Sequence, residues 1–99
     1  MSYPAIIKLF TGQAADGTSE EFALPVDFSG GFSYHSVYIF GTFGGGQVTL
    51  QASPDGTNWV NIPDSPSSAA NIVNLHIRMQ KIRAVLSGST GASINTWIV

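Results

Sequence analysis

The sequence predicts an all-β protein, an antiparallel β-sandwich of seven or eight short strands, for which a jelly roll is one fitting arrangement. Short segments with an apolar residue at every second position recur about every ten residues, and turn-forming residues separate them. No segment keeps apolar residues at helical spacing over several turns. The 11 glycines among 99 residues would also interrupt any long helix.

The N-terminal half contains three candidate strands. Residues 5–10 are the first, and residues 13–19 then form a turn around an Asp-Gly pair. Residues 21–26 are the second; because Pro25 has no N–H to donate, we expect an edge strand or a strand end there. Residues 34–42 are the third and most aromatic strand.

The clearest element is a β-hairpin over residues 47–62. Residues 47–53 alternate strictly between polar and apolar side chains, and residues 58–62 are expected to return antiparallel. Pro54-Asp55-Gly56-Thr57 is predicted to form a tight turn, with Gly56 at a positive φ.

Three further strands are expected at residues 72–78, 81–86 and 93–99, with a proline- and serine-rich connection over 63–71. The alternation is expected to point Val48, Leu50, Ala52, Ile82, Ala84 and Leu86 inward. It also places Val73, Leu75 and Ile77 on one face of their strand, and Ile94, Thr96 and Ile98 on one side of the last strand with Trp97 and Val99 on the other.

Length and composition limit the function classes. The chain is one domain, residues 1–99, without cysteine, without the pattern of a signal peptide and without an apolar stretch of the ~20 residues that a membrane helix needs. Only 10% of residues are charged and the net charge is -2, which provides no electrostatic basis for binding nucleic acid. Such a surface is weakly protected against self-association, so either it is covered by other copies or a larger assembly, or it is simply neutral and polar.

The sequence shows no convergent set of catalytic groups, and we expect no enzyme, no metal and no cofactor. Its histidines are His35, expected as a hydrogen-bonded side chain at the core margin, and His76, expected to face solvent or another subunit. The Asp-Gly pairs at Asp16 and Asp55 are explained by turn chemistry. A hydrolase remains a minor alternative, because serine is common, but no nucleophile-elbow pattern occurs.

The 11 aromatic residues suggest a contact surface. In the third strand Tyr34, Tyr38 and Phe40 share one face, so this strand is either central with both faces covered or presents an aromatic stripe to a partner or a sugar. Candidate contacts come from the N-terminal segment, the loop over residues 27–34 and this strand. They are Tyr3, Ile6, Phe10, Phe28, Phe32, Tyr34 and Tyr38.

Two segments carry a family resemblance. Residues 47–59, with the pattern Ser-x-Asp-Gly-x-x-Trp, resemble a hairpin of discoidin-like carbohydrate-binding domains and of small phage virion proteins. Residues 82–94, with Ile-Arg-Ala before a Gly/Ser-rich turn, resemble the ending of the same phage proteins. The short chain and the absence of cysteine favour the phage group.

The resemblance implies a capsid decoration or cement protein that binds and stabilises the shell. Its partners would be the major capsid protein or other virion proteins and further copies of itself, as a trimer or dimer. It would be assembled in the host cytoplasm and lie on the capsid surface. The alternatives are a tail or receptor-binding module and a carbohydrate-binding module that stacks sugars on Tyr34, Tyr38 and Trp59. No binding residue carries over, because the matching positions belong to the hairpin and the core.

Overall fold

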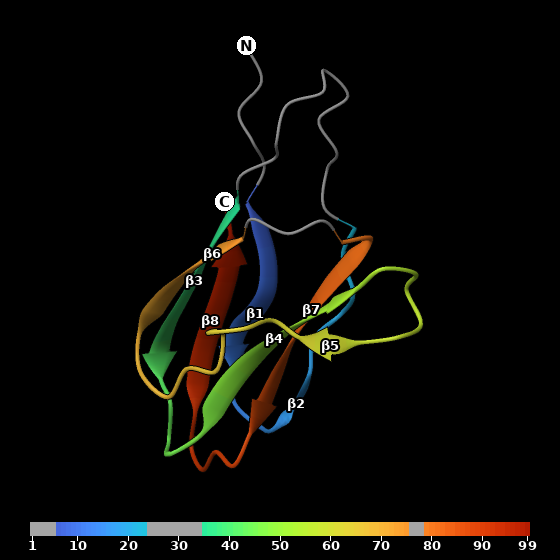
Figure 1. The fold of residues 1–99 in the computed structure, drawn as a ribbon. Coiled ribbons are helices and arrows are strands. Elements are labelled where there is room, and N and C mark those ends of the chain that lie inside the picture. The colour runs from blue at the N-terminus through green and yellow to red at the C-terminus, as the bar shows by residue number, and fades with distance from the viewer. Residues whose placement is uncertain (1–5, 24–34, 76–78) are drawn as a thin grey trace.

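The computed structural model describes residues 6–23, 35–75 and 79–99 (Figure 1). These residues form eight strands, and they include no helix that could span a membrane. The strands are β1 (Ile7–Gln13), β2 (Gly17–Thr18), β3 (His35–Thr42), β4 (Gln47–Ser53), β5 (Val60–Asn61), β6 (Asn71–Leu75), β7 (Lys81–Ser87) and β8 (Ser93–Ile98).

The strands form two four-stranded antiparallel sheets, with the orders β1-β8-β3-β6 and β2-β7-β4-β5. Figure 1 shows β1, in blue, beside β8, in red, so the two ends of the described chain meet in one sheet. The pairs are nested: β1 with β8, β2 with β7, β3 with β6 and β4 with β5. This is the strand order of a jelly roll, in which one long antiparallel hairpin is rolled into two sheets. The predicted all-β antiparallel sandwich is therefore confirmed.

The core lies between the sheets and follows the predicted alternation. Leu50, Ile82 and Ile94 are fully buried, and Ala52 packs at the core margin. Ile77, which the prediction groups with Val73 and Leu75 on one face, lies outside the described residues. The other buried apolar side chains of the core are Leu9, Phe10, Val37, Ile39, Val48, Ile62, Val73, Leu75, Ala84, Leu86, Ala92 and Ile98.

The N-terminal strands differ from the prediction in their boundaries. The first strand covers Ile7–Gln13, and the predicted turn over 13–19 contains β2, which pairs with β7. Of the predicted strand over 21–26, Phe22 forms an isolated bridge to Ile82, and residues 24–26 with Pro25 lie outside the described residues. These pairings join positions 60 or more residues apart in sequence, and local alternation carries no information about them.

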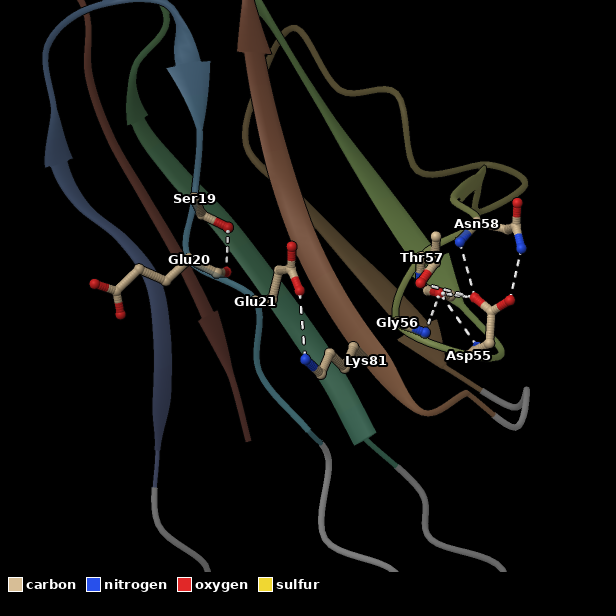
Figure 2. A network of polar contacts seen from close by, with 9 residues as sticks. Ser19, Glu20, Glu21, Asp55, Gly56, Thr57, Asn58 and Lys81 are labelled. Carbon is tan, nitrogen blue, oxygen red and sulfur yellow. Dashed lines mark hydrogen bonds and ion pairs between the residues drawn. The ribbon is translucent and has the colours of Figure 1, made fainter.

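The β4–β5 hairpin is confirmed, but a longer loop replaces the predicted tight turn. The last pair of the β4–β5 ladder joins Ala52 to Val60, and residues 54–59 form the connection between the two strands. The Asp55 carboxylate accepts hydrogen bonds from the backbone N–H groups of Thr57 and Asn58, both at 2.8 Å (Figure 2). This side-chain cap satisfies the loop backbone without a two-residue turn, while Gly56 has the expected positive φ, +83°.

Candidate docking surface

A row of side chains crosses the outer face of the β1-β8-β3-β6 sheet. The strand register aligns Lys8 with Trp97, Trp97 with Tyr38 and Tyr38 with Ile72. Their neighbours along each strand, such as Val37 and Ile98, are buried in the core, so these four side chains point away from it.

A second row lies beside the first. Val99 and Ser36 exchange backbone hydrogen bonds of 2.9 and 3.1 Å, and Ser36 is paired with Asn74. Continuing the β1–β8 register by one residue brings Ile6 opposite Val99. The Ser36 hydroxyl is 3.1 Å from the Asn74 side-chain oxygen, so this row is apolar at one end and polar at the other.

We call the outward apolar side chains of these strands the apolar face. They are Ile6, Tyr38, Phe40, Ile72, Trp97 and Val99. Five large hydrophobic residues are strongly exposed in the described part of the chain, and four of them belong to this face, with 43% to 54% of their surface accessible. Exposed apolar side chains scattered singly are ordinary, whereas a group of adjacent ones typically marks an interaction site.

Trp97 organises the centre of the apolar face. The Phe40 ring packs edge-on against its indole, with 5.1 Å between ring centroids and 83° between ring planes. The Lys8 ammonium nitrogen lies 4.5 Å from the indole centroid, a cation–π contact. The indole Nε1 is buried and has no hydrogen-bond partner among the described residues.

The apolar face is almost uncharged. Lys8 is the only Lys, Arg, Asp or Glu in β1, β8, β3 and β6 as the structure describes them, and its charge lies against the Trp97 ring. The face therefore suits a partner that buries apolar area and does not depend on ion pairs.

The outer face of the other sheet is polar. Arg83 donates from Nε to the Gln51 side chain at 2.7 Å, and Gln51 donates to Asn61 at 2.9 Å. The Arg83 guanidinium lies 4.1 Å from the Trp59 ring centroid. Lys81, at the start of β7 in the same sheet, forms an ion pair with Glu21 at 3.5 Å (Figure 2). These groups already satisfy one another, so this face is the weaker candidate for a docking surface.

The two Asp-Gly aspartates stabilise loops. Besides its two backbone contacts, Asp55 accepts a hydrogen bond from the Asn58 side chain, and these bonds hold the pKa of its carboxyl far below the usual range. Asp16 accepts hydrogen bonds from the Ser89 hydroxyl and from the backbone of Ser89 and Gly88, which also lower its pKa. Asp55 thus stabilises its own loop, and Asp16 joins the turn before β2 to the turn after β7.

The described residues contain no group of three or more His, Asp or Glu side chains arranged to hold a metal ion. His35 is half-buried at the start of β3, as expected, but its Nε2 atom is buried without a hydrogen-bond partner among the described residues. His76 lies outside the described residues.

The predicted contact residues separate into three groups. Ile6 and Tyr38 lie on the apolar face. Phe10 is 3% exposed, because its ring packs in the core, and it forms no part of the surface. The others lie outside the described residues; they are Tyr3, Phe28, Phe32 and Tyr34.

Sequence reasoning did not include Ile72, Trp97 and Val99 among the contacts. The alternation contained this information: Val73, Thr96 and Ile98 point inward, so their neighbours Ile72, Trp97 and Val99 point outward. Their grouping could not be seen, since it depends on which strands are neighbours in the sheet.

No protein-family model matches the chain, and no curated protein or solved structure matches it either.

Proposed function

We propose that the protein is a phage virion component of the capsid decoration or cement type, which acts by binding and not by catalysis. The observation that carries the proposal is the apolar face, an uncharged and exposed group of aromatic and aliphatic side chains on one sheet. A second copy or a capsid subunit would bury this face, and the binding energy would stabilise the assembled shell by mass action.

Two further observations support the proposal. The hairpin over residues 47–59 and the segment over 82–94 resemble small phage virion proteins. The jelly-roll strand order is common in viral capsid domains and in lectins, an analogy at the level of the fold.

The first test is the composition of virus particles. Particles purified from cultures that carry this gene are expected to contain its peptides at a stoichiometry comparable to the major capsid protein. Particles that form normally and lack these peptides would contradict the proposal.

The second test addresses the face that binds. Tyr38→Glu introduces a charge on the apolar face, and Val60→Glu introduces the same charge at a 66% exposed position of β5 in the other sheet. We expect Tyr38→Glu to abolish incorporation into particles and Val60→Glu to leave it unchanged. Equal incorporation of both variants would show that the apolar face is not the contact.

A carbohydrate-binding module is the second candidate function, and the exposed ring of Tyr38 favours it. The structure changes the expected platform, because Tyr38 and Trp59 lie on the outer faces of opposite sheets and Trp59 is stacked on Arg83. A sugar would therefore stack on Tyr38 beside Phe40 and could not contact Trp59 at the same time.

Glycan-array binding tests this alternative. Binding that is lost in Tyr38→Ala and retained in Trp59→Ala would support a sugar site on the apolar face. An array without any signal for the wild-type protein would exclude the glycan classes it displays and favour a protein partner.

A further inference from the structure

The four sheet edges of the sandwich are unequally protected against pairing with another strand. β1 and β6 are the edges of one sheet, and β2 and β5 those of the other. β2 and β5 are two residues long, and β1 contains two register shifts and carries Lys8. Short length, bulges and charge are the usual devices that prevent edge-to-edge association.

β6 has none of the bulges, prolines or charges that protect an edge. Its five residues, Asn71–Leu75, pair with β3 in an unbroken register and include no proline, glycine or charged residue. Ile72 is 54% exposed on this strand. β6 therefore presents a regular, uncharged edge next to the apolar face.

The free hydrogen-bonding groups of β6 follow from the ladder. Ser36 directs its N–H and C=O toward Val99, the residue that follows β8. Val37, one residue further along β3, therefore directs its groups toward β6. Since Val37 is paired with Val73, the backbone groups of Val73 face β3 and those of Ile72 and Asn74 face away. No described segment of the chain forms a backbone ladder with this free side of β6.

We propose that this edge binds a second copy of the chain, with β6 pairing antiparallel to β6 of the second copy about a two-fold axis at Val73. Ile72 of each copy would then lie opposite Asn74 of the other copy. Each of these two residue pairs would exchange two backbone hydrogen bonds, which makes four in total. The two four-stranded sheets would become one continuous sheet of eight strands, four from each copy.

A second copy fits this edge for three reasons. Antiparallel pairing about a two-fold axis requires the same strand on both sides, and the spacing of the outward groups at Ile72 and Asn74 is self-complementary. No like charges oppose each other across β6, and the net charge of -2 adds little repulsion. The Ile72 side chain, half exposed in one copy, gains cross-strand neighbours in the pair.

The pairing has a consequence for the proposed function, although it does not rest on it. A two-fold axis perpendicular to the sheet leaves the apolar faces of both copies on the same side. The row from Lys8 to Ile72 would continue into Asn74 and Ser36 of the second copy. The dimer would thus offer one doubled docking surface.

The test is sedimentation equilibrium of the wild-type protein and two matched variants, Ile72→Lys and Val60→Lys. Both positions are exposed β-branched residues of edge strands, but only Ile72 lies on β6. We expect a concentration-dependent dimer for the wild type and Val60→Lys, and a roughly tenfold or greater increase in the dimer Kd for Ile72→Lys, corresponding to about 1.4 kcal/mol or more. A wild-type protein that stays monomeric at every concentration, or equal weakening by both substitutions, would overturn the proposal.

Amide hydrogen exchange locates the interface directly. We expect the amides of Ile72 and Asn74 to become protected as the wild-type concentration rises, and to exchange freely in Ile72→Lys. Asn74→Pro removes one outward N–H and leaves the groups that face β3 intact, so it should yield a folded monomer. If Asn74→Pro does not fold, the exchange of the wild-type amides decides the question: no change with concentration refutes β6 pairing. Particle incorporation is measured separately, so failure of the dimer and failure of the virion proposal are distinguishable.

Discussion

Replacing Ser65 by alanine tests whether a buried hydroxyl completes the sheet where β5 ends. Ser65 is fully buried in the connection between β5 and β6, and its hydroxyl accepts a hydrogen bond from the backbone N–H of Leu50 at 3.1 Å. The same hydroxyl lies 2.7 Å from the Ile62 carbonyl oxygen, to which it donates. Beyond the end of β5, the Ser65 hydroxyl therefore replaces the backbone carbonyl that a neighbouring strand would offer to Leu50 of β4.

The magnitude follows from what the substitution leaves behind. In Ser65→Ala the Leu50 N–H has no partner and remains buried, which costs about 1–3 kcal/mol. The Ile62 carbonyl still accepts a hydrogen bond from the Ser65 backbone N–H at 3.2 Å, so its loss is smaller. We expect the free energy of unfolding to fall by about 2 kcal/mol, and the Tm by roughly 10 °C in a domain of this size.

Equilibrium urea unfolding, followed by tryptophan fluorescence, measures the effect. Ser68→Ala is the matched control, because Ser68 is exposed in the same connection and should change stability by less than about 0.5 kcal/mol. The amide of Leu50 should also exchange faster in Ser65→Ala than in the control. If both variants unfold at the same urea concentration, Ser65 does not complete the ladder and the reasoning is refuted.

Three other substitutions test local structure. Gly41→Ala should lower the free energy of unfolding by about 3 kcal/mol or more, because φ is +123° and a Cβ would lie 2.2 Å from the Ser93 carbonyl oxygen. Gly45→Ala is the control: Gly45 also has a positive φ but faces open space, so the loss in the same unfolding assay should be only about 1 kcal/mol. Asp55→Asn should destabilise at neutral pH. Because the folded-state pKa of Asp55 lies far below its ordinary value, its contribution is fully present above about pH 4 and declines below it, so the stability gap between variant and wild type should narrow steadily as the pH falls from about 4 toward 2. A gap that does not change with pH would contradict the role of the charged carboxylate.

The candidate docking surface was only partly predictable. Alternation along the third strand groups Tyr38 with Tyr34 and Phe40 on one face, and alternation along the last strand puts Trp97 opposite Thr96 and Ile98, but neither pattern decides which face is exposed. Sequence could not show that Lys8, near one end of the chain, lies against Trp97, near the other. It also could not show that Phe10 is buried, because the register shifts of β1 change which side chains face the core.

The amino-acid sequence by itself determined the class of this protein. Period-two alternation, glycine-rich turns and scarce charge define short amphipathic strands that must pack face to face, since each buries only one side. Apart from the local β4–β5 hairpin, strand neighbours depend on the tertiary structure, because pairs such as β1–β8 and β2–β7 close over long separations and rely on packing rather than on local preference. Only this neighbourhood assembles Ile6, Tyr38, Ile72, Trp97 and Val99 into one surface and leaves the edge of β6 open.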